Sequence, residues 1–102
     1  MEWYQYLAAF FAGAFISNSV PHYVHGVSGN KFPSPFTQPM GKALSSAPVN
    51  MLWALANLVI AYLLFIASNA SRANTASLLV IFAGFSIMSI RASIGFQKKH
   101  KE

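Results

Sequence analysis

Two histidines, His22 and His25, stand three residues apart and are the first side chains of this sequence that suggest chemistry. On a continuous helix they would share a face, and neutral imidazole is a common metal ligand. A metal site takes three or four ligands, and the third histidine, His100, lies in the C-terminal tail. A haem ligand would be buried within a helix bundle, and neither histidine is expected there. We therefore expect no metal and no haem, and interpret the pair as a contact to lipid phosphates or loop carbonyls. A proton-responsive role at about pH 6.5 is the alternative.

Arg91 is the only charged residue inside the three long apolar stretches of the chain. A charge at membrane depth suggests a function by default. Arg91 stands five residues before Phe96, the last residue of its stretch, which is about 7 Å at ~1.5 Å of rise per residue. A long side chain reaches the headgroup layer over that distance. We expect Arg91 to contact lipid phosphate, and an anionic ligand or a partner's carboxylate is the alternative.

Carboxylates and thiols are nearly absent from the sequence. Glu2 and Glu102 are the only acidic residues, and there is no cysteine. Mg²⁺-dependent group transfer needs carboxylates to hold the metal, a serine triad needs its acid, and thiol redox chemistry needs cysteine. Proton pumps use acidic groups inside the membrane. We therefore predict that the protein is not an enzyme and has no cofactor.

The composition indicates that lipid is the surrounding solvent. Of the 102 residues, 55% are hydrophobic and only 9% are charged, whereas soluble domains average about 25% charged residues. Three apolar stretches at 3–20, 48–68 and 75–96 each approach the ~20 residues that cross a bilayer as a helix. We predict an all-α integral membrane protein with three transmembrane helices in one domain over 1–102. A cleaved signal peptide is the alternative for the first stretch, but its start carries Glu2 and no basic residue.

Proline and polar residues predict where these helices begin and end. Pro21 should end the first helix, because proline disfavours a helical residue before it, and this leaves a loop over 21–46. Ser45 or Ser46 should cap the second helix, with Pro48 in its first turn, and Asn74 or Thr75 should cap the third. The link at 69–74 is so short that the two helices it joins must form an antiparallel hairpin. We therefore expect the second and third helices to be packing neighbours.

Basic residues set the expected orientation in the membrane. The loop carries Lys31 and Lys42, the tail at 97–102 carries three more lysines, and the link between the last two helices carries only Arg72. Positive residues stay in the cytoplasm. We expect a multi-pass protein of the plasma membrane, of the bacterial inner-membrane type, with its N-terminus outside and its C-terminus in the cytoplasm. The net charge of +5 would then attract anionic membrane lipids, and we expect no nucleic-acid partner.

The loop at 21–46 is rich in proline and also carries phenylalanine. Proline prevents regular helix and favours extended structure, whereas a linker in water would not need aromatic rings. The loop either rests in the headgroup layer or forms a structured cap that helps to build a site. The candidate ligands of an anionic lipid or amphiphile at this cytoplasmic rim are His22, His25, Lys31, Lys42 and Arg91.

Small and polar residues recur at helical spacing in all three predicted helices. Such faces are typical of close helix packing in membranes, where amides and hydroxyls also bond across the interface. A polar lining of a substrate path is the alternative. The candidates are Gly13 and Ser17 in the first helix, Asn50, Ala54, Asn57 and Ala61 in the second, and Gly84, Ser86, Ser89 and Ser93 in the third.

These expectations combine into a functional hypothesis. Three helices bury little surface among themselves, so we expect a homo-oligomer or a larger membrane complex. The favoured function is that of a non-catalytic accessory, assembly or scaffold subunit. A small homo-oligomeric transporter or channel is the second hypothesis, and a protein that binds an anionic lipid or amphiphile is the third.

Overall fold

Three long helices make up most of the protein. The computed structural model describes residues 2–36 and 44–98. In chain order its elements are α1 (Trp3–Val27), β1 (Phe32–Pro33), β2 (Leu44–Ser45), α2 (Ala47–Ser68), α3 (Thr75–Gly95) and the 3-10 helix η1 (Phe96–Lys98). Lys42 and the last residues of the tail lie outside this described part of the chain.

Pro21 does not end α1, contrary to the prediction from the sequence, and the helix continues to Val27. Proline within a helix removes one backbone hydrogen bond and costs ~3 kcal/mol or more. Contacts made after Pro21 offset this cost, because His22 bonds to α2 and Gly26 packs against the α2 backbone. The loop therefore covers 28–46, and both histidines belong to the helix.

The ends of α2 and α3 confirm what the sequence predicts. Ser46 caps α2, and its side chain accepts a hydrogen bond from the backbone N–H of Val49 at 3.4 Å. Asn74 caps α3 and accepts from the N–H of Ser77 at 3.3 Å. Helix α2 stops at Asn69, which has a left-handed φ of 55°. Asparagine tolerates this conformation better than most residues, so the turn into the link is local in origin.

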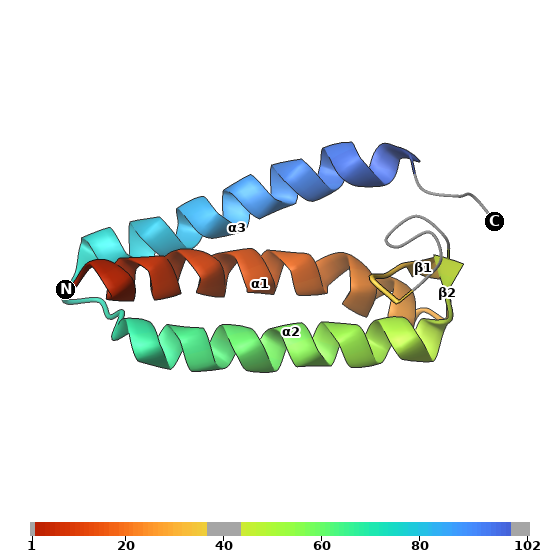
Figure 1. The fold of residues 1–102 in the computed structure, drawn as a ribbon, viewed down its shortest axis with the longest axis horizontal. Helices are drawn as coiled ribbons and strands as arrows, with labels where there is room; N and C mark the ends of the chain where they lie inside the picture. Colours follow the sequence, from red (N-terminus) through yellow and green to blue (C-terminus); the bar gives the residue numbers. More distant parts are fainter. Residues whose placement is uncertain (1, 37–43, 99–102) are drawn as a thin grey trace.

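Helix α1 lies between α2 and α3 (Figure 1). Extensive contacts join α1 to each of the other two helices, and no comparable contact joins α2 to α3 among the described residues. The prediction that the second and third helices are packing neighbours is therefore wrong, although they are consecutive and antiparallel. The short link brings only their ends together. Helix α1 instead offers small residues for close packing, which are Ala9, Ala12, Gly13, Ala14, Ser17 and Ser19.

Two glycines set the distance between α1 and α3. A Cβ atom at Gly13 would overlap the carbonyl oxygen of Ile81, and a Cβ atom at Gly84 would overlap the carbonyl oxygen of Phe10. Each backbone therefore lies directly against the other, as at small-residue contacts between membrane helices. Beyond this contact α3 rises away from α1 toward its C-terminal end (Figure 1).

The outward faces of α2 and α3 are apolar. Leu52, Val59 and Leu63 of α2 are exposed, as are Phe82 and Ile90 of α3. A contiguous apolar surface of this kind marks contact with lipid or with another protein. Both helices are long and apolar enough to cross a membrane.

A short β-ribbon covers one end of the helices. Strands β1 and β2 pair antiparallel, with Phe32 opposite Ser45 and Pro33 opposite Leu44. The Phe32 and Ser34 side chains are buried, and the hydroxyls of Ser34 and Ser45 are 2.5 Å apart. The C-terminal end of α3 lies at this capped end, whereas the N-terminus and the link between α2 and α3 lie at the opposite end (Figure 1). The described part of the loop is therefore a structured cap.

Candidate functional site

The side chain of Asn50 joins three parts of the chain at the capped end. It is fully buried. Its Nδ2 atom donates to the carbonyl oxygen of Phe32 at 2.8 Å and to that of Ser46 at 3.1 Å. Its Oδ1 atom lies 2.7 Å from Nδ1 of His22. Asn50 therefore connects α1, the loop and the start of α2.

The amide of Asn50 also determines that Nδ1 of the His22 ring carries a proton. Because Nδ2 of Asn50 donates to carbonyl groups, its Oδ1 atom must accept, and Nδ1 of His22 must donate. His22 lies beyond the stretch expected to span the membrane. Burial lowers the pKa of His22 below the usual 6.5; the hydrogen bond to Asn50 opposes this shift, and the nearby His25 adds to it. The neutral ring then keeps a lone pair on Nε2.

Two further polar pairs cross the interfaces of α1. Asn18 donates from Nδ2 to Oδ1 of Asn57 at 3.0 Å, and Asn57 itself donates to the carbonyl oxygen of Trp53 at 2.7 Å. On the side of α3, the hydroxyls of Ser17 and Ser89 are 2.7 Å apart. These amides and hydroxyls therefore find their partners inside the protein, which is the arrangement that stabilises packed helices in lipid.

Aromatic rings surround His22. The ring centroids of Phe32, Phe96 and Trp53 lie 5.4, 6.2 and 6.5 Å from that of His22, all with edge-to-face geometry. His25 stacks on Phe32 with a centroid distance of 4.3 Å and an interplanar angle of 12°. We call these rings the aromatic cluster. They belong to α1, α2, β1 and η1, so the cluster exists only when all these elements are in place.

The aromatic cluster contains two buried nitrogen atoms that have no hydrogen-bond partner in the described part of the chain, Nε1 of Trp53 and Nδ1 of His25. Leaving such a group unpaired costs about 1–3 kcal/mol. The indole nitrogen always carries its proton, whereas an imidazole nitrogen can be either donor or acceptor. Trp53 is therefore a buried donor without a hydrogen-bond partner among the described residues.

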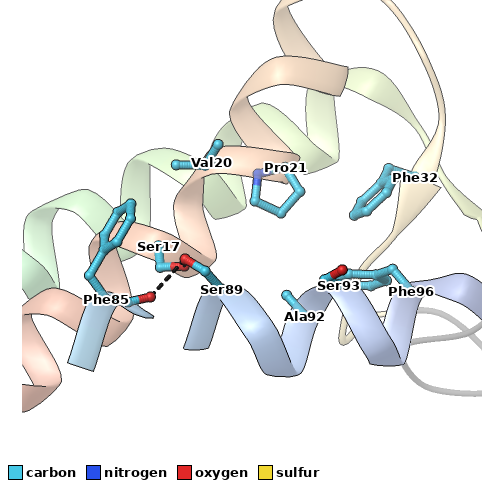
Figure 2. A pocket seen from close by; sticks show the side chains of 9 residues that line it. All are labelled: Ser17, Val20, Pro21, Phe32, Phe85, Ser89, Ala92, Ser93 and Phe96. Atoms are coloured by element: carbon cyan, nitrogen blue, oxygen red, sulfur yellow. Dashed lines mark hydrogen bonds between the residues drawn. The ribbon is translucent and has the colours of Figure 1, made fainter. Parts of the chain in front are cut away.

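One cavity, of about 320 Å³, lies between α1 and α3, and we call it the α1–α3 cavity. Figure 2 shows Val20 and Pro21 of α1 on one side of it and Ala92 of α3 on the other. Phe32 and Phe96 stand at the end toward the cap. Ser17 and Ser89 lie at the opposite end, where the dashed line marks the hydrogen bond that the Ser89 hydroxyl donates to the carbonyl oxygen of Phe85 (Figure 2). The lining is almost entirely apolar.

A second cavity, of about 300 Å³, adjoins the aromatic cluster, and we call it the Trp53 cavity. Its walls are Asn18, His22, Pro33, Ser34, Pro35, Trp53 and Phe96. Phe96 also lines the α1–α3 cavity, so the two spaces are neighbours. Both volumes fall at the lower end of the range for small-molecule sites. The pair combines an apolar space with a space that has polar walls.

The basic residues predicted to bind an anionic ligand differ in their exposure in the described structure. His22 is buried, His25 is half-buried and Lys31 is exposed. Arg91 is exposed on α3 beside Ile90, and it makes no hydrogen bond to either histidine among the described residues. Lys42 lies outside those residues. The expectation that no histidine is buried within the helices is wrong, because α1 extends past Pro21.

The residues predicted to form packing faces divide into two groups. Those of α2, which are Asn50, Ala54, Asn57 and Ala61, are all buried. Gly13, Ser17 and Gly84 are buried as well, and Ser89 bonds to Ser17. Ser86 is half-buried, and Ser93 is exposed at the edge of the α1–α3 cavity.

Sequence reasoning did not identify Trp53 and Phe96 as site residues. Trp53 stands three residues after Asn50 and four before Asn57, so the helical period places it beside the polar face of α2. That signal was available from the sequence. No such signal exists for Phe96, because its ring meets Phe32 at 4.6 Å only through the fold.

No protein-family model, no curated protein and no solved structure matches this chain. Among the described residues, no group of three or more histidine, cysteine or acidic side chains stands in a position to hold a metal ion. The features of the protein that bear on its function are therefore the geometry of the site and the apolar surface.

Proposed function

We propose that this protein is a three-span protein of the plasma membrane that acts as a non-catalytic accessory, assembly or scaffold subunit. In this proposal the N-terminus lies outside, the C-terminus lies in the cytoplasm, and the protein works in a homo-oligomer or a larger complex. Residues 3–20 of α1 would be the third span. They extend for about 27 Å at ~1.5 Å per residue, close to the bilayer core of about 30 Å, and the rest of the helix, with His22, would lie beyond it.

The observation that carries the proposal is the division of polar and apolar groups. Asn50 and Asn57 have no exposed surface and bond within the protein, while the outward faces of α2 and α3 are apolar. Buried amides that bond within the protein favour packing over the lining of a water-filled path, which would need polar groups open to solvent. The exposed apolar faces are suited to lipid and to other membrane helices.

Native mass spectrometry from mild detergent tests the proposed function, because it reports the number of copies and any co-purifying protein together. We expect an oligomer or a complex with another membrane protein. A well-folded monomer without partners would contradict the accessory role. A reporter active only in the cytoplasm, fused after Glu102, tests the orientation, and a silent reporter on well-expressed protein would contradict it.

The channel hypothesis makes a different prediction for the same residues. If Asn57 lined a path, Asn57→Leu would abolish flux of solute through reconstituted protein and leave the number of copies unchanged. If Asn57 is a packing residue, the substitution lowers stability and assembly. Wild-type protein without flux in liposomes would further favour the accessory role.

A further inference from the structure

We propose that the outward face of α3 binds one anionic phospholipid of the surrounding bilayer, with the lipid phosphate on Arg91 and an acyl chain along Ile87 and Ile90. The inference rests on the membrane location in the proposed function, and it is independent of the accessory role. A protein that is extracted from membranes but retains no such lipid would contradict this inference alone.

A shallow groove of about 490 Å³ follows this face near the C-terminal end of α3, and we call it the Arg91 groove. Its walls are Ile87, Ile90, Arg91, Ile94 and Gly95. Their spacing along the sequence places them on one side of the helix. The three isoleucines are exposed by 55, 62 and 61%. The groove therefore offers an apolar strip about two helical turns long with a positive charge beside it.

The Arg91 groove faces away from α1. At the same level of α3, Ser89 bonds to Ser17 of α1. Ala92 and Phe96 line the α1–α3 cavity, so they also lie on the side toward α1. Arg91 is not among the residues that line this cavity, and its side chain is exposed. The groove is therefore open to the molecules that surround the protein.

The position of Arg91 along α3 suits a contact with a lipid head group. Arg91 stands four residues before Gly95, the last residue of α3, which is about 6 Å of helix at ~1.5 Å per residue. A long side chain can reach the headgroup layer over that distance. Lys98 is exposed just beyond, in η1. Both cations attract an anionic head group, and the planar guanidinium can hold two oxygen atoms of one phosphate.

A second copy of the chain is less suited to pair with Arg91. The acidic residues of the sequence are Glu2 and Glu102. Glu2 caps the start of α1, at the end of the protein opposite to the Arg91 groove (Figure 1). If the copies share one orientation in the membrane, Glu102 is the side-chain carboxylate that a second copy could bring to Arg91. Glu102 lies outside the described residues, and the test below includes it.

Retention of added lipid in native mass spectrometry, after extraction from membranes in mild detergent, tests the proposal. The probes are phosphatidylglycerol, diacylglycerol with the same chains, and inorganic phosphate. We expect one phosphatidylglycerol per chain, retained about tenfold more strongly than diacylglycerol, which has no phosphate. Inorganic phosphate should not displace the lipid, because it has no chain to occupy the groove. Equal retention of the two lipids, or displacement by inorganic phosphate, would overturn the proposal.

Two matched pairs of variants locate the site. Arg91→Gln removes the charge of the groove, and Arg72→Gln removes the other arginine of the chain, which is exposed in the link between α2 and α3. We expect about fivefold weaker retention of phosphatidylglycerol for Arg91→Gln only. Ile90→Ser and Leu79→Ser make the same change at side chains that are 62 and 63% exposed. Only Ile90→Ser should weaken retention, by about threefold. Equal effects within either pair would overturn the assignment of the site.

The same spectra separate a lipid from a protein partner. If Arg91→Gln and Glu102→Gln both lower the number of copies while retention of lipid stays unchanged, Arg91 pairs with a carboxylate and the proposal is wrong. Arg91→Lys keeps the charge but not the planar fork, so we expect retention between that of wild type and that of Arg91→Gln. Should Arg91→Gln fail to fold, the pair at Ile90 and Leu79 and the lipid comparison on wild type still decide the question.

Discussion

The two interfaces of α1 are built differently. Against α2, the helix uses amides and a histidine, with Asn18 bonded to Asn57 and His22 bonded to Asn50. Against α3, it uses a close backbone contact at Gly13 and a single hydroxyl pair, and beyond these the helices separate around a cavity. Directional hydrogen bonds hold α2 in one register along α1. A glycine contact sets only a distance, so α3 is free to diverge and leave a cavity.

The largest expected effect is at the glycine contact. Gly84→Leu places a side chain where the backbone of Phe10 lies, so α1 and α3 must separate at their closest point. We expect a loss of about 3 kcal/mol in the free energy of unfolding, measured in mixed micelles with SDS as denaturant. Gly95→Leu is the control, because a side chain there meets open space. Similar losses of stability for both variants would contradict the claim that α1 and α3 depend on a close backbone contact at Gly84.

Removing the amide of Asn50 tests the other interface. Asn50→Leu keeps the volume but removes the hydrogen bonds of Asn50 to Nδ1 of His22 and to the carbonyl oxygen of Phe32. We expect a loss of about 2 kcal/mol in the free energy of unfolding and easier proteolysis of the cap. Asn30→Leu, at an exposed loop position, should change the free energy by less than about 0.5 kcal/mol. An unchanged Asn50→Leu protein would show that the cap does not depend on this amide.

The pH dependence of stability should report the buried histidine. The pKa of His22 in the folded protein lies below its usual 6.5, mainly because of burial. The unfolded chain therefore binds more protons between these two values, and stability falls as the pH drops below about 6.5. Above that pH the contribution of His22 is fully present. Unfolding of wild type and His22→Phe across this range measures it, and an identical slope in the variant would contradict the assignment.

The smallest expected effect concerns the hydroxyl pair. Ser17→Ala removes the bond to Ser89, and interhelical hydrogen bonds of this kind contribute about 0.6 kcal/mol on average in membranes. Ser93→Ala, at an exposed position on the rim of the cavity, should have no measurable effect on unfolding. If Ser17→Ala lowered the free energy of unfolding as much as Asn50→Leu does, the two interfaces would not differ in the way described.

The sequence by itself determined the helices and the buried face of α2. Three features depend only on residues close together in the sequence: the apolar stretches, the cap residue Asn74, and the spacing of Asn50, Ala54 and Asn57. Because this spacing follows the helical period, the three α2 residues share one face of the helix. The caps and the buried face are therefore found where the sequence predicts them. Whether these helices span a membrane, and in which direction, stays a prediction from composition and charge.

Only the tertiary structure decided which helices pack together and where the polar groups meet. Pro21 is locally unfavourable inside a helix, yet contacts of His22 and Gly26 with α2 keep α1 helical past it. Phe96 and Trp53 both reach His22 from distant parts of the chain. Such outcomes depend on summed long-range contacts that no local pattern encodes. The central place of α1, and the cavities beside it, follow from those contacts.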